Sequence, residues 1–392
     1  MIIKIYNGNI LTPYRMIKNG TVVISEGKIA QVSDRAIETP DDAVEIDAKG
    51  NYISPGFIDM HIHGGGGYDF MDGTEEAFLK IAETHARYGT TSMVPTTLTS
   101  EKKDLMRTLD LYERAHENNL SGSQFLGMHL EGPYFSPGQC GAQDPRYIRK
   151  PDPKEYEQIL AYSSSIARWS AAPELPGAIT FGKRLGQAGI LAAVAHTDAI
   201  YEEVLEAYEN GYTLATHLYS AMSGVTRKNA FRYAGTIESA FLLDMDVEII
   251  ADGIHLPAPL LKLIYKIKGA DKIALITDAM RAAAMPEGES ILGPASTGLK
   301  VIVEEGVAKL PDRTSFAGSV ATADRLVRTM VEMADITLLE SVRMMSLTPA
   351  RIMKVESHKG SLVEGKDADI IIFDRNIQVQ TTIVQGRIVY QK

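Results

Sequence analysis

Residues 57–67 read FIDMHIHGGGG, an apolar run that ends in two histidines and four glycines. Side chains on a β-strand alternate between its two faces, so His61 and His63 point the same way from the end of a predicted strand. Two imidazoles on one face are a natural start for a metal site, although histidines also occur in cores as satisfied polar groups. The glycines allow the backbone to turn sharply beside them.

The middle of the chain continues this strand with a regular alternation of strands and helices. Strand-like runs are predicted at 56–63, 91–95, 125–131, 167–172, 190–196, 214–218, 247–251 and 272–277. Helical patterns separate most of them, including 201–209 and 74–88, where Asp72 and Glu75 have the spacing of a capping box. The alternation predicts an α/β fold, a (β/α)8 TIM-like barrel over residues 55–355. A doubly wound open sheet is the second choice, because no G-x-G-x-x-G follows the first strand.

The two ends of the chain are rich in β-forming residues and differ from the middle. Residues 1–54 and 356–392 each contain short strand patterns separated by turn residues. Neither end would bury much apolar surface alone, so we expect both termini to form one small β-sandwich domain.

Composition excludes several classes of function. The formal charge is −10 and the sequence has no basic run, so nothing indicates a basic surface that would bind nucleic acid. The single cysteine, Cys140, excludes an intrachain disulfide and is typical of a reducing compartment. No apolar run reaches the roughly 18 residues of a membrane-spanning helix. We therefore expect a cytoplasmic protein with a small-molecule substrate, and no nucleic-acid or membrane partner.

Polar residues follow the predicted strands at the end where a barrel places its active site. They are His61, His63, Glu131, His196, His217, His255 and Asp278. A carboxylate at Glu131, between apolar residues, is costly unless it is paired or binds a metal ion. These positions predict a metal site of four histidines and Glu131, with Asp278 as a general acid or base rather than a helix cap. His255 is predicted to contact the substrate, His129 to orient a ligand or fill the barrel, and His85 to pack in the core.

Together, these motifs resemble the amidohydrolase superfamily and, within it, the N-acetylglucosamine-6-phosphate deacetylases. The strings are PGFIDMHIHG (55–64), HLEGP (129–133), AHTDA (195–199), THLYSAM (216–222), DGIH (252–255), TDA (277–279) and KGSLVEGKDAD (359–369). The resemblance covers nearly the whole chain. It implies metal-dependent hydrolysis of the acetamide of N-acetylglucosamine 6-phosphate by a homodimer.

The resemblance also assigns residues. Glu131, His196 and His217 would hold the main divalent ion, zinc or iron. His61 and His63, with Glu131 bridging, would hold a second, and one or two ions remain open because some family members lack this pair. Asp278 would be the catalytic acid and base. The substrate would be bound by Ala142, Gln143, Ser220, Ala221, His255, Phe316, Ala317, Gly318 and an arginine from a second subunit, either Arg227 or Arg232, of which we favour Arg227.

Three departures from the family pattern concern the sugar rather than the metal. Ser220 stands where Asn is common, Gln143 stands where His is common, and the loop after Met222 is about two residues longer than usual. Deacetylation of N-acetylgalactosamine 6-phosphate, or another C–N hydrolysis of the superfamily, is therefore the alternative. The predicted fourth strand contains no lysine, which disfavours cyclic amidases. A catalytically inactive scaffold is disfavoured because every predicted ligand is present.

Overall fold

The apolar runs of the middle of the chain form one parallel sheet in the computed structural model, which describes residues 1–392. In spatial order its strands are β6 (Phe57–Ile62), β9 (Thr90–Thr97), β11 (Met128–Glu131), β12 (Ile166–Ala171), β13 (Leu191–Val194), β14 (Tyr212–Ala215), β17 (Asp246–Ile249) and β18 (Ile273–Leu275), and the short β10 (Gln124–Phe125) lies beside β9. Strands β6, β9, β11 and β17 are buried along their whole length, as expected for a parallel sheet covered on both faces.

The last strand of this sheet returns to the first. The backbone N–H of Asp278 donates to the carbonyl of His61 at 2.9 Å, and the N–H of His63 donates to the carbonyl of Ala279 at 2.9 Å. The sheet is therefore curled as in a TIM-like barrel, and the carboxyl ends of its strands face one side. The predicted α/β class with a parallel sheet is confirmed.

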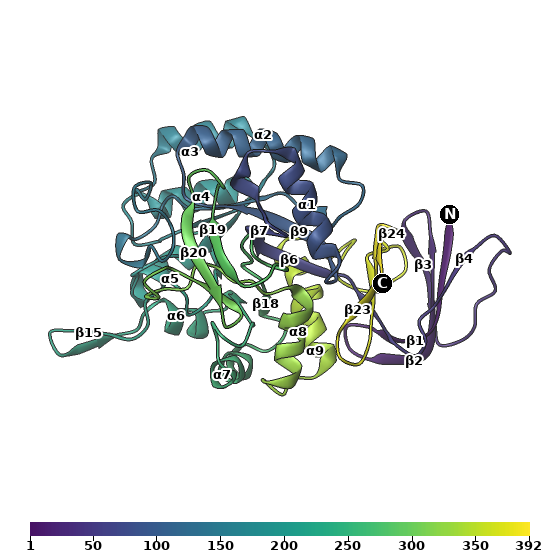
Figure 1. Ribbon diagram of the computed structural model, residues 1–392. Helices are drawn as coiled ribbons and strands as arrows, with labels where there is room; N and C mark the ends of the chain where they lie inside the picture. The colour runs from purple at the N-terminus through teal and green to yellow at the C-terminus, as the bar shows by residue number, and fades with distance from the viewer.

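Helices surround the sheet (Figure 1). They are α1 (Glu75–Ala86), α2 (Lys102–Asn118), α3 (Pro153–Tyr162), α4 (Ala178–Gln187), α5 (Tyr201–Glu209), α6 (Thr236–Leu242), α7 (Ala258–Lys268), α8 (Ala323–Glu332), α9 (Leu338–Met345) and α10 (Leu347–Ile352). The prediction of a helix at 201–209 is confirmed. None of the helices has the length and apolarity needed to span a bilayer.

The predicted capping box at the start of α1 is wrong. Thr74 caps the helix instead, because its hydroxyl accepts the N–H of Ala77. Asp72 belongs to the preceding short 3-10 helix, where its carboxylate accepts the N–H of Asp69. Gly73, with φ of 73°, turns the chain between the two elements and separates Asp72 from α1.

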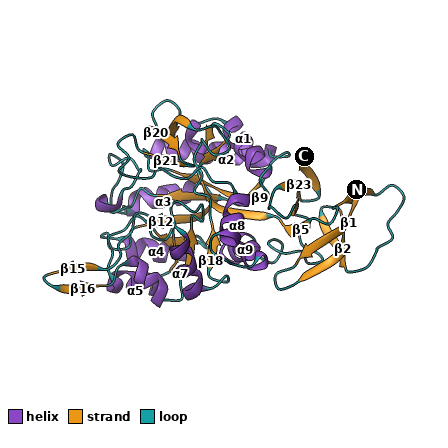
Figure 2. Cartoon of the chain, turned by 60° about the horizontal axis from the view of Figure 1, so that its bottom comes forward, coloured by secondary structure: helices purple, strands orange, loops and turns teal.

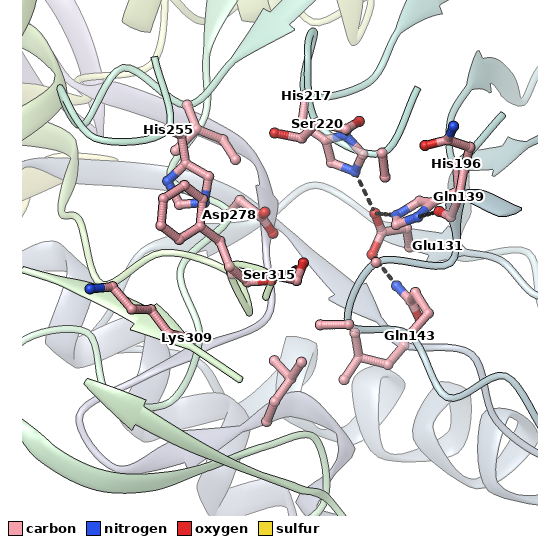
Figure 3. A pocket seen from close by; sticks show the side chains of 18 of the residues that line it. Glu131, Gln139, Gln143, His196, His217, Ser220, His255, Asp278, Lys309 and Ser315 are labelled. Atoms are coloured by element: carbon pink, nitrogen blue, oxygen red, sulfur yellow. Dashed lines mark hydrogen bonds and ion pairs between the residues drawn. The ribbon is translucent and has the colours of Figure 1, made fainter. Parts of the chain in front are cut away.

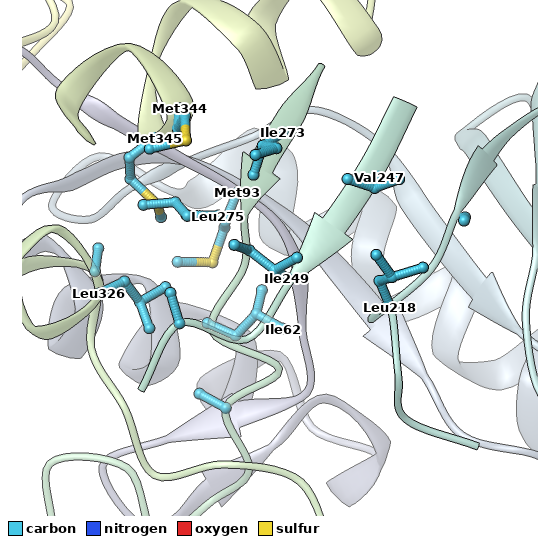
Figure 4. Close-up of a cluster of buried hydrophobic side chains, with 14 of the residues drawn as sticks. Ile62, Met93, Leu218, Val247, Ile249, Ile273, Leu275, Leu326, Met344 and Met345 are labelled. Carbon is cyan, nitrogen blue, oxygen red and sulfur yellow. The ribbon is translucent and has the colours of Figure 1, made fainter. Parts of the chain in front are cut away.

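Apolar side chains of the strands pack against the C-terminal helices (Figure 4). Ile249 and Leu275 come from β17 and β18, while Leu326 comes from α8 and Met344 and Met345 come from α9. All belong to a cluster of 61 buried residues that extends around the parallel sheet. This cluster holds the strands rigidly, so side chains at their ends have fixed positions.

Both ends of the chain contribute to a second, eight-stranded sheet. Its order is β24 (Arg387–Gln391), β23 (Val379–Val384), β22 (Ile370–Phe373), β5 (Tyr52–Pro55), β1 (Ile2–Leu11), β2 (Met16–Ser25) and β3 (Lys28–Ser33), with β4 (Val44–Asp47) paired to β1. Antiparallel pairing of β22 with β5 joins the two halves. Figures 1 and 2 place both termini at the same side of the molecule. The structure shows one sheet here, and a separate β-sandwich domain stays a prediction.

Three further antiparallel elements interrupt the strand–helix alternation, and the first is the short pair of β7 (Gly64–Gly65) and β8 (Tyr68–Asp69) after β6. The hairpin of β15 (Thr226–Lys228) and β16 (Phe231–Tyr233) projects away from the rest of the chain (Figures 1 and 2). A three-stranded sheet of β19 (Gly288–Leu292), β20 (Leu299–Glu304) and β21 (Val307–Lys309) follows β18.

The terminal sheet provides a test of this architecture. Ile372 in β22 is 2% exposed and belongs to a 13-residue cluster that both termini build. We expect Ile372→Ala to lower the free energy of unfolding by about 2–5 kcal/mol, because it leaves a cavity where the halves meet. Urea unfolding followed by circular dichroism measures this change. Ile388→Ala in β24, at 38% exposed, is the control and should change it by less than about 0.5 kcal/mol. Equal effects would contradict a shared terminal core.

Candidate metal centre and active site

Four imidazoles meet one carboxylate at the carboxyl ends of the parallel strands. Nε2 of His217, His196 and His61 lies 3.1, 3.3 and 3.4 Å from Oε1 of Glu131, and Nε2 of His63 lies 3.3 Å from Oε2. All five side chains are buried. Figure 3 shows Glu131 between the loops that carry His196 and His217. The structure thus brings together every residue predicted as a metal ligand.

Three of these histidines lie beyond the strands that were predicted to contain them, and the first, His63, directly follows β6, which ends at Ile62. Strand β13 ends at Val194 and β14 ends at Ala215, so His196 and His217 each stand two residues further on. Both have positive φ, 47° and 30°, as does Asp278 with 47° after β18. A non-glycine residue in this region costs free energy and persists only where its surroundings hold it. The turn redirects each side chain toward Glu131, a change that strand periodicity does not show.

Hydrogen bonds at Nδ1 leave Nε2 of three histidines free to bind a cation. Nδ1 of His196 faces the carbonyl of Gln139 at 2.8 Å, and Nδ1 of His217 faces the carbonyl of Ser220 at 3.2 Å. Nδ1 of His61 faces a carboxylate, Oε2 of Glu248, at 3.5 Å. Because each of these acceptors takes a proton from Nδ1, Nε2 is the nitrogen that can bind a cation once the ring is neutral.

The donors divide into two groups that share Glu131. One comprises His61, His63 and Glu131, and the other comprises Glu131, His196 and His217. Nε2 of His61 is buried without a hydrogen-bond partner, and so is Nδ1 of His63. Imidazole nitrogens and a bridging carboxylate are suitable ligands for a divalent transition metal, so the residues fit one or two ions.

Electrostatics of the protein also favour a cation at this point. Burial opposes a charge on His61, but the nearby carboxylates, Glu131 first, outweigh it and raise its pKa to about 9. The same competition raises the pKa of His63 to about 10, with Asp278 and Glu131 as the partners. Burial opposes the charge of Glu131 too, yet the surrounding histidines hold its pKa well below the ordinary value. Positive charge therefore compensates a buried carboxylate.

Asp278 and His255 lie beside the ligands. Oδ1 of Asp278 is 3.1 Å from Nε2 of His63 and 3.6 Å from Nε2 of His61. Nδ1 of His255 is 2.8 Å from Oδ2 of Asp252, whose other oxygen accepts the N–H of His255. Asp252 thus fixes the ring of His255, which contacts Phe316 at 4.6 Å between ring centroids.

The remaining buried histidines near the site are not ligands. His129 faces Ser170 Oγ at 2.7 Å, and its ring meets that of His61 edge to face at 4.6 Å. Burial lowers the pKa of His85 to about 4, and its Nε2 donates to the carbonyl of Gly64 at 2.9 Å. This bond supports the turn after His63. A Cβ at Gly65 would lie 2.4 Å from that nitrogen, so the close approach requires glycine.

A cavity of about 640 Å³ opens over these groups. Its lining includes seven of the predicted substrate residues, namely Ala142, Gln143, Ser220, Ala221, His255, Phe316 and Gly318. Ala317 is buried next to them and is not part of the lining. Arg227 and Arg232 are elsewhere, paired across the exposed β15–β16 hairpin.

The amide of Gln143 makes two contacts that the sequence did not indicate. Its Nε2 donates to Oε2 of Glu131 at 2.8 Å, and its Oε1 accepts the N–H of Thr99 at 2.8 Å. Gln143 therefore holds the carboxylate from the side that faces away from His196 and His217. It lies at the boundary between metal ligands and sugar pocket.

Sequence reasoning missed several residues of the site. Lys309 and Arg313 line the cavity from the segment around β21, and no motif marks them. Arg168 and Glu248 form a fully buried ion pair beneath His61. Burial alone would raise the pKa of Glu248, but the charges of Arg168 and His61 outweigh burial and lower this pKa. The sequence did contain a signal for Arg168 and Glu248, namely a charged residue inside an apolar strand run. The same signal identified Glu131.

The sequence matches the amidohydrolase family over residues 52–389. The chain belongs to this family. Its relatives include an N-acetylglucosamine-6-phosphate deacetylase of Lysinibacillus sphaericus, 37% identical over 94% of this chain and 92% of the relative. An N-acetylgalactosamine-6-phosphate deacetylase of Escherichia coli O157:H7 is 33% identical over 93% of each. A Mycobacterium smegmatis N-acetyl-D-glucosamine-6-phosphate deacetylase variant, solved in complex with N-acetyl-D-glucosamine-6-phosphate, has a TM-score of 0.90 and 30% identity, covering 100% of this chain and 99% of its own.

Amidohydrolases are metal-dependent hydrolases, and the donor groups found here agree with that chemistry. The resemblance drawn from the motifs is thereby confirmed at the level of the family. The disfavoured scaffold reading has no support, since neither donor group lacks a member.

The raised histidine pKa values predict proton release when the amidohydrolase binds metal. With pKa values of about 9 and 10, His61 and His63 carry protons near neutral pH in the ion-free protein. Metal binding requires neutral imidazoles, so at about pH 8 it should expel protons, and affinity should rise with pH. Titration calorimetry in buffers of different ionisation enthalpy counts them. His63→Asn should release fewer, and an enthalpy independent of the buffer would contradict the prediction.

Proposed function

We propose that this amidohydrolase removes the acetyl group of N-acetyl-D-glucosamine 6-phosphate, giving D-glucosamine 6-phosphate and acetate. The observation that carries the proposal is the placement of Asp278 beside His61 and His63, in a cavity that Glu131, His196 and His217 also line. Relatives named for this reaction, in organisms from Lysinibacillus sphaericus to Mus musculus, support it.

The proposal includes the architecture and the ion. Residues 55–355 form the closed (β/α)8 barrel that carries the site, and 1–54 with 356–392 form the small β domain. Glu131, His196 and His217 would hold the main divalent ion, zinc or iron, and His61 and His63, together with Glu131, would hold a second. A divalent ion of this kind lowers the pKa of water to about 7 and polarises a carbonyl oxygen.

The side chains of the site divide the remaining work. Asp278, next to His63, accepts a proton from the water that attacks the acetyl carbonyl. His255, whose ring Asp252 holds, contacts the carbonyl oxygen as charge develops there. Asp278 then returns the proton to the amide nitrogen as the C–N bond breaks. Water is consumed, and acetate and the amine leave.

The sugar phosphate lies between the metal ligands and the outer part of the cavity in this proposal. Ser220 and Ala221 supply backbone groups for the phosphate, and Ala142, Phe316, Ala317 and Gly318 contact the sugar. Neither Arg227 nor Arg232 lines the cavity of its own chain, because both lie on the projecting hairpin. A homodimer in which the hairpin of one subunit brings Arg227 to the site of the other accounts for this placement.

Replacing Asp278 tests the assignment of acid and base. We expect Asp278→Asn to reduce kcat by about 10²–10⁴-fold, because an amide cannot accept the proton of the attacking water. Elemental analysis should show that the variant retains metal, since Asp278 belongs to neither donor group. Near-normal turnover in a fully loaded variant would contradict the assignment.

A substrate panel tests the identity of the sugar. Acetate release should be fastest with N-acetylglucosamine 6-phosphate, slower with its galactosamine and mannosamine counterparts, and slowest without the phosphate. The relative named for the galactosamine epimer makes that compound the essential competitor. Arg227→Met should raise KM for the phosphorylated sugar and leave the unphosphorylated one unchanged. Preference for the unphosphorylated sugar would contradict the phosphate contacts.

A further inference from the structure

A buried ion pair that the proposed mechanism does not use lies under the metal ligands. Arg168 on β12 and Glu248 on β17 are both fully buried. The guanidinium contacts both carboxylate oxygens of Glu248, with Nη2 3.0 Å from Oε2. The same guanidinium donates to the carbonyl of Met60 at 3.0 Å and to Oγ1 of Thr216 at 3.2 Å.

These contacts connect the pair to ligands of both donor groups. Met60 precedes His61 and Thr216 precedes His217, so Arg168 touches the neighbour of one ligand in each group. Glu248 reaches further, because its Oε2 lies 3.5 Å from Nδ1 of His61. On the other side of the ring, Nε2 of His61 lies 3.4 Å from Oε1 of Glu131.

His61 differs from the other ligands in what its Nδ1 contacts. His196 and His217 face backbone carbonyls, and Nδ1 of His63 has no partner. Among the four ligands, only His61 has a carboxylate facing its Nδ1. A carboxylate that accepts the Nδ1 proton fixes the tautomer and orientation of a ligand and makes its other nitrogen more basic.

The structure favours a functional role over a purely structural one. A buried ion pair gains little stability over well-packed apolar residues, because both charges lose their hydration. Arg168 needs Glu248 as a partner, but it would be satisfied equally by a carboxylate directed away from His61. The guanidinium instead directs Glu248 at the histidine that begins the His61–His63–Glu131 group.

We propose that Glu248 is a positioning residue for His61, held in place by Arg168, and that it sets the affinity of the His61–His63–Glu131 group for its divalent ion. The inference rests on the proposed role of His61 as a ligand. It extends that role to two residues on strands β12 and β17 that neither line the cavity nor belong to a donor group.

Glu248→Gln tests the inference, with Asp246→Asn as its matched control. Asp246 lies on the same strand and pairs with Arg351 at 2.6 Å, so both changes convert an arginine-bound carboxylate into an amide, but only Glu248 faces His61. Cobalt and zinc binding to the full-length chain would be measured by titration, by the visible spectrum of the cobalt form and by the rate of ion loss to a chelator. We expect Glu248→Gln to lower the affinity for one of the two ions by about 10–100-fold. We expect Asp246→Asn to change the affinity for neither ion.

The outcomes separate this inference from the proposed function. Loss of one ion in His61→Asn but not in Glu248→Gln would overturn the role of Glu248 alone. Wild-type protein that binds one ion, unaffected by His61→Asn, would overturn both the role of Glu248 and the second metal group. If Glu248→Gln does not fold, the double change Arg168→Met with Glu248→Met removes both charges together. This double variant must also bind one of the two ions more weakly than the wild-type protein does. Tight binding of two ions by this variant would overturn the inference.

Discussion

The carboxylate of Glu131, buried among four imidazoles, is the constraint on which the rest of the site depends. A buried carboxylate without a cationic partner would be strongly destabilising. Four Nε2 atoms within 3.4 Å satisfy it. Two of them come from the end of β6, and the others come from the turns after β13 and β14. The parallel sheet has to hold all of these ends in register, and the large core around it supplies the rigidity.

Several buried carboxylates in this protein each face a histidine or an arginine. Glu131 faces the histidines, Glu248 faces both His61 and Arg168, and Asp252 faces His255. Each pair fixes the orientation of a group that has to meet an ion or a substrate. The side of the cavity that is proposed to bind the sugar is built differently, from loops and hairpins outside the parallel sheet.

The convergence of the site was predictable because parallel strands place their carboxyl ends on one side. Residues such as His61 and Glu131 lie at the ends of apolar runs. The order of the strands along the chain was therefore enough to assign them to one active site. The exact strand ends were not predictable, since His196 and His217 depend on positive φ values that neighbours impose. Arg168 and Glu248 lie far apart in the sequence, and only their pairing distance shows that they act together.

The sequence by itself determined the family, the parallel α/β scaffold and the types of residue at its active end. Periodicity and spacing carry this information because they reflect local geometry and the order of strands. Only the tertiary structure decided which oxygen of Glu131 meets which histidine, that Gln143 binds Glu131, and that Glu248 faces His61. Such contacts depend on rotamers and on loop turns between distant segments. Their energies are set by burial and by partners, which exist only after the chain has folded.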